Sequence, residues 1–139
     1  MIKSFFFAGC GLLLTASCSE GDGANGVYQG VPLVSSAGDT LYIKAYNWGL
    51  TGDHQISTIS DTNVPIGWDD QQRPEMVKGL DPFLYRFAHD TLTVYTRAPL
   101  PAFAIHCPSI VVQYQLVKNH QYMGLYEQLS KQTYYRVPR

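Results

Sequence analysis

The stretch Phe83-Leu84-Tyr85-Arg86-Phe87-Ala88-His89-Asp90-Thr91-Leu92-Thr93-Val94-Tyr95 decides the fold, because it contains two alternating runs joined by a two-residue turn. Residues 83–88 and residues 91–95 each repeat with a period of two, which is typical of a β-strand with one buried face. His89-Asp90 has the length of a tight hairpin turn, and both residue types tolerate the left-handed backbone that such a turn needs. The stretch therefore predicts an antiparallel hairpin.

A second pair of strands is predicted upstream of this hairpin. Residues 39–46 carry apolar side chains at every second position, which indicates a strand with one buried face. Residues 55–60 are the expected returning strand. Its isoleucines, Ile56 and Ile59, are three residues apart, so both face the same core only if a β-bulge shifts the register.

The chain after the hairpin is expected to cross the fold and then return to it. Three prolines between residues 99 and 108 exclude a central strand in that segment. Residues 109–117 alternate again and predict another strand, and residues 134–137 predict a closing strand. Between them, four apolar and aromatic side chains at helical spacing predict one short helix. These four side chains are Tyr122, Leu125, Tyr126 and Leu129.

The succession of short strands without a β-α-β rhythm defines the fold class. We predict a mainly β fold, namely a small antiparallel sandwich or barrel-like domain with one short C-terminal helix. A chain of 139 residues has the size of a single domain. The formal net charge of −1 provides no strongly basic face, so no nucleic-acid partner is expected.

The first twenty residues have the pattern of an export signal. Lys3 precedes an uncharged, mostly apolar core at residues 5–16, which is too short to span a membrane. The core ends in Leu14-Thr15-Ala16-Ser17-Cys18, which resembles the lipobox of bacterial lipoproteins. The resemblance implies cleavage before Cys18, acylation of its thiol and amine, and an outer-membrane lipoprotein of a Gram-negative envelope, facing the periplasm or the surface. The alternative is an ordinary secretory signal cleaved near Ala16, without a lipid.

The resemblance also implies how the chain is divided. The expected parts are a signal peptide (1–17), a flexible tether and lead-in (18–38), and a β domain (39–139). The tether begins with glycine, serine and acidic residues, which cannot bury enough apolar surface to become ordered. Residues 27–34 are expected as a short edge segment, because Gly30 and Pro32 interrupt them. The connector Trp48-Gly49-Leu50-Thr51-Gly52 is similar to one in small uncharacterised bacterial envelope proteins, a resemblance that implies no activity.

The residues most often used in catalysis show no convincing reaction motif. Cys107 follows His106 directly, and adjacent side chains on an extended chain point apart, so we expect a buried structural thiol there. The four histidines are scattered without metal-binding spacing, and we expect no metal or cofactor. Asp69-Asp70 is a carboxylate pair of the kind that glycoside chemistry uses, but we expect it to be exposed in a loop.

Two loops carry the residues best suited to binding, because binding residues commonly lie on loops held by a rigid scaffold. The candidates are Trp48, Asp53, His54, Trp68, Asp69 and Asp70. The leading interpretation is a lipid-anchored envelope protein whose domain is a non-catalytic binding or structural module with a protein or glycan partner. One alternative is a small envelope enzyme that uses Cys107 or the loop carboxylates. Another is a glycan-binding module, whose aromatic rings would stack on sugars.

The lipid anchor leads to the first prediction. Replacing Cys18 by serine should release the protein from the membrane fraction or impair its export, because the lipid supplies the main membrane affinity. The thermal unfolding midpoint should not change, because the residue precedes a flexible tether. Intact-mass analysis of the wild-type protein should show a chain that starts at Cys18 and carries acyl groups. An unmodified amino terminus would contradict the prediction.

Overall fold

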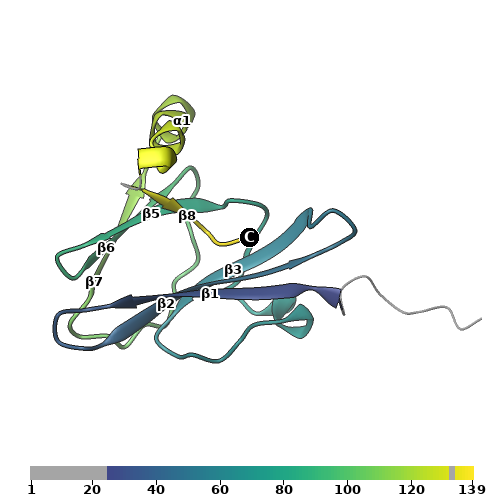
Figure 1. The fold of residues 1–139 in the computed structure, drawn as a ribbon, viewed down its shortest axis with the longest axis horizontal. Helices are drawn as coiled ribbons and strands as arrows, with labels where there is room; N and C mark the ends of the chain where they lie inside the picture. Colours follow the sequence, from purple (N-terminus) through teal and green to yellow (C-terminus); the bar gives the residue numbers. More distant parts are fainter. Residues whose placement is uncertain (1–24, 132–133) are drawn as a thin grey trace, which may run out of the picture.

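The computed structural model describes residues 25–131 and 134–139, so the predicted leader (1–17) and residues 18–24 of the predicted tether and lead-in, Cys18 included, lie outside the described residues. Within the described part, the chain forms two four-stranded sheets and one short C-terminal helix, α1 (Asn119–Glu127) (Figure 1). The prediction of a mainly β fold with one such helix is confirmed. Of the two architectures expected, the structure has the sandwich, because the two sheets are separate and are not closed into one barrel.

Sheet A has the strand order β1-β2-β3-β4, and all of its neighbouring strands are antiparallel. Its strands are β1 (Val27–Val34), β2 (Thr40–Trp48), β3 (His54–Ser60) and β4 (Val77–Lys78). The eight residues of β1 all pair with β2, so the folded domain includes residues that the sequence placed in the lead-in. Pro32 is tolerated because β1 is an edge strand, where one side needs no backbone donor.

Strand β3 corrects the expectation of a β-bulge. The register between β2 and β3 is continuous from Trp48 opposite His54 to Tyr42 opposite Ser60. Ile56 and Ile59 are both buried, but they belong to different apolar clusters. Residues 61–76 cover the outer face of sheet A, so Ile56 is buried there while Ile59 faces the other sheet. A strand buried on both faces needs no bulge to bury residues three positions apart.

Sheet B has the strand order β7-β6-β5-β8. Its strands are β5 (Phe83–Ala88), β6 (Thr91–Thr96), β7 (Val111–Leu116) and β8 (Tyr135–Arg136). The predicted hairpin is present, and both turn residues, His89 and Asp90, have positive φ values of 50° and 54°. The expectation of antiparallel pairing throughout is wrong for β6 and β7, which are parallel. The proline-containing segment 97–110 is long enough for the crossover that a parallel pair requires.

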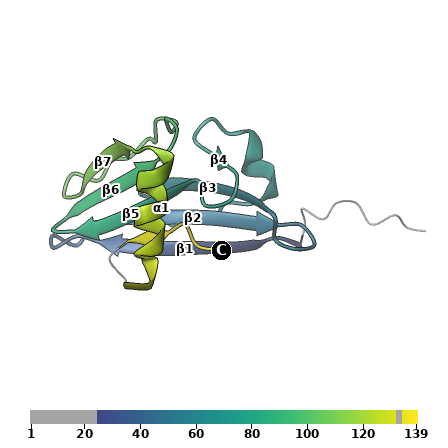
Figure 2. The same ribbon diagram turned by 90° about the horizontal axis from the view of Figure 1, so that it is seen from above.

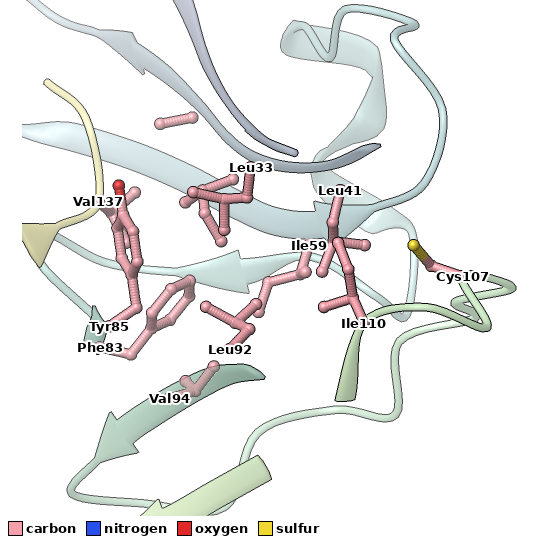
Figure 3. Close-up of a cluster of buried hydrophobic side chains, with 12 residues drawn as sticks. Leu33, Leu41, Ile59, Phe83, Tyr85, Leu92, Val94, Cys107, Ile110 and Val137 are labelled. Atoms are coloured by element: carbon pink, nitrogen blue, oxygen red, sulfur yellow. The ribbon is translucent and has the colours of Figure 1, made fainter. Parts of the chain in front are cut away.

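The main core lies between the two sheets (Figure 3). Sheet A contributes the predicted inner face of β2, and sheet B contributes alternate residues of β5 and β6, as the sequence pattern predicts. Together with β8 and the crossover they form one buried cluster. Its members are Leu33, Leu41, Ile43, Ala45, Ile59, Phe83, Tyr85, Leu92, Val94, Cys107, Ile110 and Val137.

Helix α1 covers the face of sheet B that points away from sheet A (Figure 2). Tyr122 of the helix packs with Leu84 and Tyr95 of the sheet, and its hydroxyl donates a hydrogen bond of 2.9 Å to the carbonyl of Asp81. The rest of the predicted helical stripe packs against the same cluster. The inner faces of the two sheets therefore pack on each other. The outer face of sheet A is covered by residues 61–76, and the outer face of sheet B is covered by α1.

The two faces of β6 provide a prediction about stability. Val94→Asp should unfold the domain, because it places a charge in the main core without a partner. Thr93→Asp should change the unfolding midpoint little, because residue 93 lies outside that core and opposite Arg86 in the register, where a carboxylate finds an opposite charge. Circular dichroism during heating measures both variants. Equal midpoints for the two variants would show that the faces are assigned wrongly.

Candidate functional site

The outer face of β2 carries an aromatic pair at the end of the strand. Tyr46 and Trp48 are two residues apart, so their side chains point to the same face. Their rings stack with centroids 5.8 Å apart. The hydroxyl of Tyr46 accepts a hydrogen bond of 3.1 Å from the backbone N–H of Gly26, just before β1 begins. The start of β1 therefore helps to fix the ring against which Trp48 packs.

Strand β3 adds an imidazole to this pair. His54 stands opposite Trp48 in the register, and the two rings stack with centroids 5.5 Å apart. Asp53 orients the imidazole, since its carboxylate lies 3.0 Å from Nδ1 of His54. The hydrogen bond with His54 is the main cause that lowers the pKa of Asp53. An ionised, exposed carboxylate thus stands beside the stacked rings at neutral pH.

The second tryptophan comes from the loop that covers sheet A. Trp68 is the first residue of a short 3-10 helix, η2 (Trp68–Gln72), and its ring meets the ring of Trp48 edge-on, at 87° and a centroid distance of 5.4 Å. Trp68 remains 44% exposed. This edge-to-face geometry is favourable because the positive edge of one ring meets the negative face of the other.

Asp70 holds the helix η2 in place. Its carboxylate accepts a hydrogen bond of 2.7 Å from the backbone N–H of Gly67 and another of 3.0 Å from the guanidinium of Arg73. Desolvation opposes the ionisation of Asp70, but the hydrogen bonds from Gly67 and Arg73 outweigh it and lower its pKa. Asp70 therefore stabilises the loop that carries Trp68, and its hydrogen-bond partners are Gly67 and Arg73 rather than residues of the aromatic cluster.

We name Trp48, His54 and Trp68 the aromatic platform. Four of the six predicted binding residues meet there, namely the platform residues and Asp53. Asp69 is exposed on η2, next in the chain to Trp68. Tyr46, which supports the platform, is not among the predicted binding residues, although its position two residues before Trp48 on a strand places both side chains on one face.

Two glycines of the β2–β3 turn have the positive φ values that the connector suggested, 95° at Gly49 and 63° at Gly52. A side chain at Gly49 would also collide with the carboxylate of Asp53. Gly52 has open space around the position of a Cβ atom. Gly49 therefore has a second role, because its lack of a side chain leaves room for the carboxylate that orients His54.

Cys107 is buried in the main core, as expected for a structural thiol. Burial raises the pKa of its thiol, and the charge of Asp39 raises it further. The side chain of the adjacent His106 is 89% exposed, and its backbone N–H donates a hydrogen bond of 2.7 Å to Asp61. A protonated thiol and an outward-facing imidazole are poorly arranged for nucleophilic catalysis.

Within residues 25–131 and 134–139, no three histidine, cysteine or acidic side chains are grouped in a way that could hold a metal ion. No helix of this described part is long and apolar enough to cross a membrane.

Comparison with known proteins found no matching family model, no matching curated protein and no matching solved structure. The site is therefore interpreted from its own geometry.

The turn supplies a prediction about the platform. Gly49→Ala should lower stability by about 1 kcal/mol through the positive φ. It should also change the tryptophan emission, because the collision with Asp53 disturbs His54 on Trp48. Gly52→Ala is the matched control, with a positive φ but no collision, and its emission spectrum should match the wild type. Identical spectra for all three proteins would contradict the role given to Gly49.

Proposed function

We propose that this protein is a lipid-anchored protein of the bacterial envelope whose β domain is a non-catalytic binding module, and that the aromatic platform binds a glycan. One observation carries the proposal: rings from β2, β3 and η2 meet at one place on the outer face of sheet A, with Trp68 partly exposed. Core packing explains most aromatic side chains of the described residues, but it does not explain an exposed tryptophan set against a second tryptophan.

The chemistry of the platform fits a sugar. One face of a pyranose ring presents C–H groups, which an aromatic ring attracts through its negative π face. The hydroxyl groups of a sugar need acceptors, and the exposed carboxylates of Asp53 and Asp69 lie next to platform residues in the chain. A few polar groups beside an apolar surface are the usual composition of a site for a small organic ligand.

The predicted lipid anchor at Cys18 is close in the chain to the strand β1, which lies beside the platform. β1 begins at Val27, opposite Asn47, one residue before Trp48 of the platform. Eight residues separate Cys18 from Val27, and the nine Cα–Cα steps between these two residues span at most about 30 Å when fully extended. A lipid at Cys18 would therefore keep the platform close to the membrane surface, and the glycan that we propose must be accessible there.

The test uses the fact that both tryptophans of the chain lie in the platform. A glycan array probed with the full-length protein in detergent identifies the sugar, and titration with that sugar should shift the tryptophan emission. Trp68→Ala should weaken binding roughly tenfold, because it removes the exposed ring, and tenfold corresponds to about 1.4 kcal/mol.

Tyr114→Ala is the matched control for that titration. Tyr114 is 50% exposed and stacks on Phe103, but it lies on sheet B, away from the platform. The affinity of the Tyr114→Ala variant for the sugar should equal that of the wild-type protein. The glycan proposal fails if the array shows no binding, or if both variants lose affinity to the same extent.

A further inference from the structure

A second site lies further along the outer face of β2, at Lys44. Its side chain is among the largest of the fully buried side chains, and the residue is only 2% exposed. Sequence alternation suggested a half-buried strand with this face in solvent. Residues 61–76 cover the face instead and enclose the lysine. A fully buried lysine is rare unless its charge is paired.

The ammonium group of Lys44 has few partners. It donates one hydrogen bond of 2.8 Å to the carbonyl of Val64, and the ring of Tyr42 lies 5.8 Å from it. An ammonium has three donors, so a single carbonyl is an incomplete partner. Among the described residues Lys44 forms no ion pair.

The charged side chains near Lys44 have other partners. Arg73 forms ion pairs with Asp70 and Glu75, and Asp61 accepts the hydrogen bond from the backbone of His106. Burial lowers the pKa of Lys44, the charge of Arg73 lowers it further, and the charges of Asp61 and Asp70 act in the opposite direction. The ammonium is therefore a buried positive charge whose counter-charges are incomplete.

Lys44 lines a cavity of about 550 Å³, a volume in the range of small-molecule sites. The cavity lies between the strands β2 and β3, the covering loop and the crossover. Apolar atoms of Val64, Ile66 and Met76 form part of its wall, and Asp61 and Glu75 line another part. The buried cation Lys44 thus stands at an apolar wall, in a cavity that is also lined by these carboxylates and by Arg73.

We propose that this cavity binds a small monocarboxylate, whose carboxylate accepts hydrogen bonds from Nζ of Lys44 and whose short apolar part packs against Val64, Ile66 and Met76. A single negative charge matches Lys44, since Arg73, the other cation of the lining, is already paired with Asp70 and Glu75. Asp61 and Glu75 would repel a second negative charge, which disfavours phosphate and dicarboxylates. The proposal stands independently of the glycan proposal, because it uses none of the platform residues.

Butanoate is the probe, because it combines one carboxylate with a three-carbon chain. The full-length protein in detergent should unfold about 5 °C higher in butanoate at ten times its dissociation constant than in chloride at the same ionic strength. Butanamide, which has the same shape without the charge, should produce no shift. Equal effects of butanoate and butanamide, or no effect of either, would overturn the proposal.

Lys44→Met tests the residue itself, since methionine fills similar space without a charge. The variant should lose the response to butanoate, and without butanoate it should be at least as stable as the wild type, because a buried charge has been removed. Lys78→Met, at an exposed lysine of β4, should retain the full response. A less stable Lys44→Met that still responds to butanoate would show that Lys44 only anchors Val64, and the proposal would be wrong.

Two further measurements keep the test decisive. If Lys44→Met does not fold, NMR of the wild-type protein replaces it, and butanoate should shift the side-chain signals of Lys44 while those of Lys78 stay unchanged. Unchanged Lys44 signals would refute the site. Trp68→Ala should retain the butanoate response even though it weakens glycan binding, so that the two proposals can fail separately.

Discussion

The structure depends on the burial of both faces of the strand β2. Leu41, Ile43 and Ala45 on its inner face are fully buried in the core between the sheets. Lys44 and Tyr46 on its outer face are also buried, and the segment 61–76 is what covers them. Burial of apolar surface is the main driving force for folding, so a strand buried on both faces fixes the sheet, its covering loop and the opposite sheet together.

The same constraint creates both proposed sites. The covering loop brings Trp68 to the ring of Trp48 at one end of β2, and it encloses Lys44 in a cavity further along the strand. The two sites differ in physical character, because one is an exposed aromatic surface and the other is a buried cation with apolar walls. A module with both would recognise two chemically different groups on one face of one sheet.

Local patterns predicted much of the fold. The hairpin at His89-Asp90, the helix over residues 119–127 and the inner face of β2 all follow from spacing within a single segment. The pairing of β6 with β7 did not follow from local pattern, because the crossover brings together strands separated by fourteen residues, and its direction depends on how that segment packs. The prediction of a bulge in β3 was wrong for a similar reason. The spacing of its isoleucines within the strand does not reveal that a distant loop covers the second face of the sheet.

The sequence by itself predicted an export signal that resembles a lipobox, determined the mainly β class, and supplied the set of candidate binding residues that includes the platform. Those features depend on composition, on periodicity and on turn chemistry, which are local. Only the tertiary structure decided that Trp48, His54 and Trp68 meet, that Asp70 serves the loop, and that Lys44 is enclosed. Each of these depends on contacts between segments far apart in the chain, and alternation along one strand does not reveal what covers its outer face.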